Sequence, residues 1–100
     1  MTSKERAFLR SMANTMDPIL HIGKDGITPA VVQQAWDALE ARELIKVTLQ
    51  RYAPFEDTRE ACNALCEKAH AEPVQCIGSK FVLYRRSREE PHILDGMDKK

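Results

Sequence analysis

Long apolar segments are absent from this chain of 100 residues, although 43% of its residues are hydrophobic. A helix that crosses a bilayer needs roughly 20 consecutive apolar residues, and charged residues interrupt every apolar run well before that length. The segment from Thr2 to Arg10 mixes charged and apolar residues and does not resemble a secretory signal. We therefore expect one soluble, cytoplasmic domain that makes no contact with a membrane.

Cysteine is scarce, and the three residues Cys62, Cys66 and Cys76 form no C-x-x-C motif. An odd number of cysteines without an export signal favours reduced thiols over a disulfide framework. Cys62, Cys66 and His70 recur at four-residue steps on one predicted helix, which a metal ion could in principle use. A closed zinc site needs a fourth ligand, so packing of the thiols in the core is favoured and metal binding is the alternative.

Signatures of catalysis are missing as well. The sequence contains neither a Walker loop nor a dinucleotide-binding fingerprint. His21 and His92 have no neighbouring nucleophile or paired carboxylate in a catalytic pattern. We therefore expect a protein that is not an enzyme, with no cofactor and no small-molecule substrate.

Net charge is also absent, because 15 basic residues balance 15 acidic ones. The distribution is more informative than the sum. Residues 74–88 contain four basic residues and no acidic one, whereas residues 89–100 contain more acidic than basic residues. One interpretation is a basic strip that follows a phosphate chain, made of Lys80, Arg85, Arg86 and Arg88, with Arg51 as a further candidate. The alternative, a solvated strand end, explains the basic stretch equally well.

Turn and capping residues divide the chain into seven elements. Thr2 with Glu5 has the pattern of a capping box, Thr28 with Pro29 opens a second helix, and Asp57 with Glu60 opens a third. The first helix is expected to end near Met16, before Asp17-Pro18. Four segments have the composition or alternation of strands, namely Pro18 to Ile22, Leu44 to Leu49, Val74 to Ile77 and Lys80 to Tyr84.

These elements predict an α/β (α+β) fold in the order α-β-α-β-α-β-β. The first two strands should pair in parallel through a right-handed crossover, and Gly78-Ser79 should close a tight hairpin. Residues 1–88 form the domain, and residues 89–100 should be a mobile tail because they contain few apolar side chains. The core of the second helix should be Val32, Ala35, Trp36 and Leu39, and the strand aromatics Phe81 and Tyr84 should also be core.

The segment Gly23-Lys24-Asp25-Gly26 lies between a predicted strand and a predicted helix. Its glycines permit close approach of a polyanion, and exposed amides at a helix N-terminus favour phosphate. A G-x-x-G loop clamps nucleic-acid backbone in KH domains. The alternative is an ordinary loop that reverses the chain, and Asp25 would repel phosphate.

Three motifs in order resemble the CRM domain, also called the YhbY-like family, over about residues 2 to 88. They are residues 19–28 (ILHIGKDGIT), residues 43–47 (ELIKV) and residues 74–85 (VQCIGSKFVLYR). The resemblance implies a mixed four-stranded sheet with three helices, similar to the C-terminal domain of bacterial translation initiation factor three. It also implies that the G-x-x-G loop contacts RNA, and that stand-alone bacterial members associate with precursors of the large ribosomal subunit.

The expected function is therefore non-catalytic binding of ribosomal RNA in large-subunit precursors, with ribosomal proteins as further partners. Zero net charge, Asp25, and Ala71-Glu72-Pro73 in place of a helix-closing glycine depart from the family pattern. The alternative function is a protein–protein interaction module in which the loop serves only as a turn. The family match supplies Gly23, Lys24, Asp25, Gly26 and Arg85 as RNA-binding residues, and Thr28, Arg51, Lys80, Arg86 and Arg88 complete the candidate set.

Overall fold

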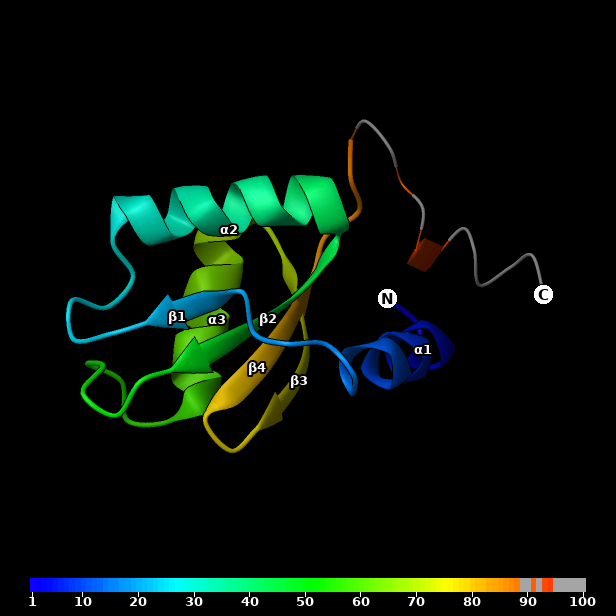
Figure 1. Ribbon diagram of the computed structural model, residues 1–100. Coiled ribbons are helices and arrows are strands. Elements are labelled where there is room, and N and C mark those ends of the chain that lie inside the picture. Colours follow the sequence, from blue (N-terminus) through cyan, green and yellow to red (C-terminus); the bar gives the residue numbers. More distant parts are fainter. Residues whose placement is uncertain (89–90, 92, 95–100) are drawn as a thin grey trace.

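Helices and strands alternate along the chain before a final hairpin (Figure 1), in a computed structural model that describes residues 1–88, 91, 93 and 94. The sheet order is β1-β2-β4-β3, in which β1 is parallel to β2 and the other pairs are antiparallel. The predicted mixed sheet and element order are confirmed. The elements are α1 (Ser3–Ala13), β1 (Leu20–Ile22), α2 (Pro29–Arg42), β2 (Leu44–Leu49), α3 (Thr58–Ala69), β3 (Glu72–Ile77) and β4 (Lys80–Tyr84).

All three predicted helix starts are confirmed by hydrogen bonds. At α1 the Thr2 amide donates to Glu5 Oε1 at 2.8 Å and the Glu5 amide donates to Thr2 Oγ1 at 3.1 Å. The hydrogen bond from the Thr2 amide lowers the pKa of the Glu5 carboxyl below its usual value. At α3 the Asp57 carboxylate accepts from the Glu60 amide at 2.8 Å. Local capping chemistry thus fixes where each helix begins.

The predicted end of the first helix at Met16 is wrong, because α1 ends at Ala13 with Asn14 as its C-cap. The Met16 amide donates to the carbonyl of Ala13 at 3.1 Å, which is a tight turn and no longer an α-helical bond. This turn sends the chain through Pro18 into β1, which starts at Leu20 and so later than predicted.

Two separate cores lie on the two faces of the sheet (Figure 1). Helices α2 and α3 cover one face, and α1 covers one end of the other. Ile93, which is 8% exposed, also packs in the α1-side core. Most of the predicted tail, residues 89–100, lies outside the described residues. The α1-side core contains Leu9, Ala13, Leu44, Val74, Val82, Tyr84 and Ile93.

The predicted core stripe of α2 needs two corrections. Val31, and not Val32, packs against the core together with Ala35 and Leu39. Trp36 is only half-buried and lies outside both cores. Its ring lies against His70, with the ring centroids 5.5 Å apart in an edge-on arrangement.

The thiols lie where α3 packs on the sheet. Cys62 and Cys66 are buried and Cys76 is partly buried. The hydrogen bond with Cys66 and burial raise the pKa of the Cys62 thiol, and burial raises the pKa of Cys76 to about 11. Among the described residues, no group of three His, Cys, Asp or Glu side chains could hold a metal ion, and no helix is long and apolar enough to span a membrane.

Candidate nucleic-acid interface

The G-x-x-G loop forms a tight turn after β1, with its tip exposed and Gly26 buried. The Gly26 amide donates to the Gly23 carbonyl at 3.0 Å, which closes the turn around Lys24 and Asp25. Gly26 has a φ of +72°, a conformation that L-residues adopt at a cost. Lys24 and Asp25 are both exposed at the tip. The turn therefore presents its cationic side chain to solvent.

The N-terminus of α2 follows the loop directly. Thr28 is the N-cap, and its Oγ1 accepts from the Val31 amide at 3.2 Å. Pro29 is at the first helical position, and the first turn contains no acidic residue. The partial positive charge of the helix start is therefore not offset by an acid of its own first turn. Thr28 thus acts here as a cap that orients the helix beside the loop.

A second segment, the connector of residues 50–56, packs against this loop. The Gln50 amide donates to the Ile22 carbonyl at 2.8 Å, which aligns the connector with the end of β1. A Cβ atom placed at Gly26 would lie 3.1 Å from Pro54 Cγ, so the proline ring sits directly against the glycine. We call the two segments together, residues 23–26 and 50–54, the loop–connector surface.

The connector contributes two exposed side chains to this surface. Arg51, one of the candidate RNA-binding residues, is exposed, and Tyr52 is 79% exposed. Tyr52 was not among the predicted site residues. Its position beside an arginine in a proline-containing connector was the available signal, since such aromatics stack on bases in RNA-binding proteins.

Asp25 is the one acidic residue at the tip of the loop. Within the described part of the chain its carboxylate has no hydrogen-bond partner that would tie it to the loop. The carboxylate is exposed beside Lys24 and reduces the local positive potential. A carboxylate at this position would weaken any contact of the loop with phosphate.

Arg85 lies away from the loop, with its guanidinium inside the protein. Its Nη1 donates to the Ala69 carbonyl at 2.9 Å, and its Nη2 forms an ion pair with Glu40 Oε2 at 3.1 Å. Its Cζ atom lies 4.0 Å from the centroid of the Trp36 ring. The side chain is 10% exposed. Arg85 therefore joins α2, α3 and β4, and its charge is compensated within the protein.

The remaining predicted basic residues are divided between the two ends of the sheet. Lys80 pairs with Thr48 at the carboxyl end of β2, which is also the end that carries the loop. Arg85 follows Tyr84, which pairs with Leu44 at the opposite end of β2, about 17 Å away for six strand residues. The exposed side chains of Arg86 and Arg88 lie near this second end. The structure does not join these arginines to the loop in one strip.

The fold and the surface together define a small α+β domain that exposes a glycine loop and the start of a helix at one end of a mixed sheet. The chain belongs to the CRS1/YhbY (CRM) domain family, whose model matches residues 1–85. This match confirms the resemblance found in the sequence.

Three relatives illustrate the relationship. Over 93 residues the chain is 40% identical to the Bacillus subtilis protein named "Probable RNA-binding protein YqeI", which covers 93% of this chain and 96% of that protein. It is 35% identical over 89 residues to a Haemophilus influenzae "RNA-binding protein", covering 89% of each. The solution structure of Staphylococcus aureus protein SAV1595 superposes with a TM-score of 0.78 at 44% identity, over 93% of this chain and 96% of that one.

Proposed function

We propose that this protein binds RNA without catalysing a reaction, and that the loop–connector surface makes the principal contact. The observation that carries the proposal is the packing of Pro54 against Gly26, because it brings the connector, with exposed Arg51 and Tyr52, against the loop that carries exposed Lys24. This end of the sheet then offers backbone amides, two cations and an aromatic ring. These groups suit the phosphates and an unstacked base of RNA.

The RNA we propose is ribosomal RNA in precursors of the large subunit, with ribosomal proteins as further partners in the cytoplasm. The CRM resemblance supports this choice, because stand-alone bacterial members of the family are associated with such particles. The zero net charge of the chain also supports a local contact over diffuse attraction to any polyanion. Selection would then depend on RNA shape and on unpaired bases more than on total charge.

Replacement of Lys24 tests the loop. We expect Lys24→Ala to lower the slope of log affinity against log salt by about one unit, because one phosphate contact is lost. The measurement is filter binding of ribosomal RNA extracted from large subunits, over a range of salt concentrations. Lys68→Ala is the matched control, since Lys68 is an exposed lysine in the last turn of α3. The neighbouring Ala69 carbonyl accepts from Arg85, at the end of the sheet opposite the loop.

Two results would contradict this proposal. Unchanged affinity and slope in Lys24→Ala would remove the loop from the interface. A wild-type protein that fails to retain ribosomal RNA, yet captures partner proteins after nuclease treatment, would favour the protein–protein interaction module.

Tyr52 gives an independent prediction about the connector. Loss of one base-stacking contact costs about 1–3 kcal/mol, so Tyr52→Ala should weaken RNA binding about tenfold. Tyr52→Phe should bind like the wild type, because the ring is retained. The slope against salt should not change in either variant, because neither alters a charge. The ring is 79% exposed, so the free energy of unfolding should change by less than about 0.5 kcal/mol.

A further inference from the structure

The α1-side face of the sheet is only half covered. Leu44, Val74, Val82 and Tyr84 pack in the α1-side core at one end of this face. Toward the other end of the strands, no helix of the described residues covers the sheet on this side (Figure 1). Strand register identifies the side chains there, because residues two apart on a strand share a face. We call this uncovered part the open sheet face, and its residues are His21, Lys46, Thr48, Gln75, Ile77 and Lys80.

One row of this face crosses all four strands at the end that carries the loop. His21 on β1 pairs with Thr48 on β2, Thr48 pairs with Lys80 on β4, and Lys80 pairs with Ile77 on β3. Only Ile22 separates His21 from the G-x-x-G loop. The Leu49 amide donates to the Ser79 carbonyl at 2.7 Å, which fixes the hairpin turn beside the connector. The row is therefore continuous with the loop–connector surface.

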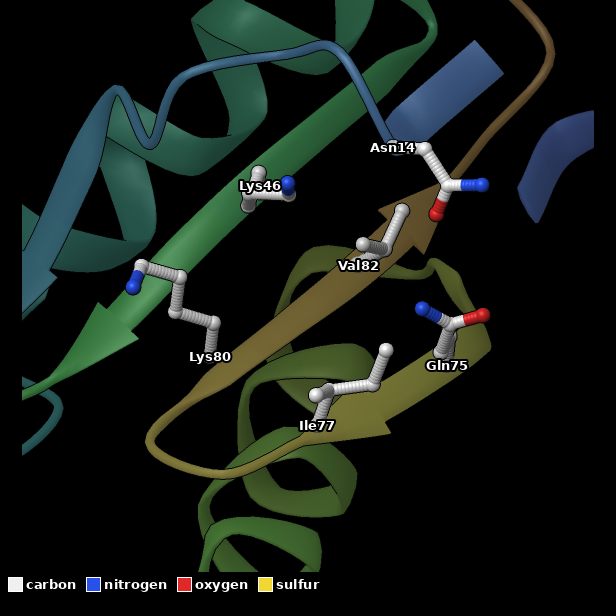
Figure 2. Close-up of a pocket in the computed structure, with 6 residues that line it drawn as sticks. All are labelled: Asn14, Lys46, Gln75, Ile77, Lys80 and Val82. Atoms are coloured by element: carbon white, nitrogen blue, oxygen red, sulfur yellow. The ribbon is translucent and has the colours of Figure 1, made fainter. Parts of the chain in front are cut away.

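A hollow of about 240 Å³ lies in this face, between the row and the end of α1. Figure 2 shows Lys46 and Lys80 projecting from neighbouring strands, with Ile77 and Gln75 on β3 and Asn14 at the end of α1. The Lys46 ammonium donates to the Met16 carbonyl at 2.9 Å, which holds its stem in place and leaves two N–H donors.

The lining of the hollow indicates the charge of its ligand. Two of the six lining residues are lysines, and the structure places no acidic side chain among them. Ile77 is 61% exposed and offers an apolar surface next to these cations. An anionic group with an apolar plane attached suits this combination, and a nucleotide has both. The hollow is smaller than a typical pocket for a small molecule, roughly 300–1,000 Å³, which favours a strand lying across the face over an enclosed metabolite.

We propose that the open sheet face binds a single-stranded segment of the same RNA that the loop–connector surface contacts. The inference rests on the proposed function and assigns a second contact to it. Lys46 and Lys80 hold the phosphates, the exposed Ile77 supports a ribose or a base, and the RNA strand continues past His21 and Thr48 toward the loop. We expect a single strand, because the bases of double-stranded RNA are paired and stacked and cannot turn onto Ile77.

The test uses the full chain and a fluorescein-labelled oligouridylate of about 12 nucleotides, within the range of single-strand sites. The variants are Lys80→Ala, the pair Lys46→Ala with Lys80→Ala, and Ile77→Ala, with Lys68→Ala as the control of equal charge. Each lysine lost from a single-strand contact lowers the salt slope by about 0.7. The ratio of the wild-type affinity to that of the double variant should therefore fall about sevenfold as the salt concentration rises from roughly 50 to 200 mM.

Ile77→Ala separates the apolar contact from the charges. It should weaken binding severalfold with an unchanged slope, because it removes no cation. Lys46→Ala also removes the hydrogen bond to the Met16 carbonyl and could disturb the fold. Lys80→Ala by itself leaves that bond in place and therefore tests the charge alone. Affinities and slopes of the lysine variants equal to those of Lys68→Ala would overturn the proposal, as would a wild-type chain that retains ribosomal RNA but not the oligouridylate. Neither result bears on the proposed contact of the loop with RNA. That contact would be contradicted by an unchanged affinity and salt slope in Lys24→Ala.

Discussion

Replacement of Arg85 by alanine is expected to lower the free energy of unfolding by about 3 kcal/mol, which is about 15 °C in the unfolding temperature of a domain of this size. The side chain is 10% exposed and its ion pair with Glu40 spans 3.1 Å. Removing one partner of a buried pair leaves the other charge uncompensated, and that cost is typically 3–5 kcal/mol. Glu40 is 25% exposed, so solvent reduces the penalty to the lower end of this range.

Further contacts of Arg85 would be lost with the ion pair. Nη1 donates to the Ala69 carbonyl in the last turn of α3, where the helix dipole favours a cation. Nη2 also donates to the Trp36 carbonyl at 3.4 Å, and the guanidinium stacks on the Trp36 ring. A lysine offers a single ammonium in place of the planar fork, so Arg85→Lys should recover only part of the lost stability.

Arg88 provides the control for this prediction. Its Cζ atom lies 5.6 Å from the centroid of the same Trp36 ring, and its side chain is exposed. Arg88→Ala should therefore change the free energy of unfolding by less than about 0.5 kcal/mol. The measurement is urea unfolding followed by tryptophan fluorescence, with Trp36 as the single tryptophan.

RNA binding by the same variants separates a structural role from a contact with RNA. At a temperature where both proteins are folded, Arg85→Ala should bind ribosomal RNA with the affinity and salt slope of the wild type. If Arg85→Ala instead kept the wild-type stability and its salt slope fell by about one unit, Arg85 would be a residue that contacts RNA. The family resemblance suggested that role, and the internal ion pair with Glu40 argues against it.

Local chemistry made most of the fold predictable. Helix starts depend on contacts three residues apart, such as Thr2 with Glu5 and Asp57 with Glu60, so the sequence alone was sufficient. The alternation of Ile45 and Val47 with Lys46 correctly separated the two faces of β2. Interactions of short range along the chain leave their signature in short stretches of sequence.

Contacts between distant segments were not predictable in the same way. Arg85 and Glu40 are 45 residues apart, and no periodicity relates them. Trp36 stands at a core-like helical position, yet a guanidinium covers its ring. The open sheet face is assembled from one or two residues on each of four strands, so the positions of its lysines relative to each other follow only once the strand register is known. Tyr52 was missed because its exposure depends on how the connector packs.

The contact between Gly26 and Pro54 leads to the second prediction with a large expected effect, a loss of RNA affinity when Gly26 is replaced. Gly26→Ala should weaken binding of ribosomal RNA about tenfold, the equivalent of one lost base-stacking contact. The added Cβ would lie 3.1 Å from Pro54 Cγ, so the proline ring must shift by a few tenths of an ångström, and alanine at a φ of +72° also strains the turn that the connector packs against. No charge changes, so the cause would be geometric.

Gly78 is the matched control for this substitution. It also has a positive φ, +57° against +72° at Gly26, but an added Cβ there would meet nothing within 4 Å. Gly78→Ala should therefore lose about 1 kcal/mol of stability from backbone strain alone. Gly26→Ala should lose about 2 kcal/mol, because displacement of the proline ring adds to the same strain. Urea unfolding of the two variants measures the difference.

Pro54→Ala completes a double-mutant cycle that isolates the contact between loop and connector. Alanine lacks the Cγ atom that the new side chain would meet, so in the Gly26→Ala background it should restore part of both stability and RNA affinity. A coupling energy of about 0.5–1 kcal/mol is expected between the two positions. Additive effects, or equal RNA binding by Gly26→Ala and Gly78→Ala, would show that the two segments act separately on RNA. The expected coupling would mean that a conformation available to glycine at position 26 sets where Arg51 and Tyr52 meet the RNA.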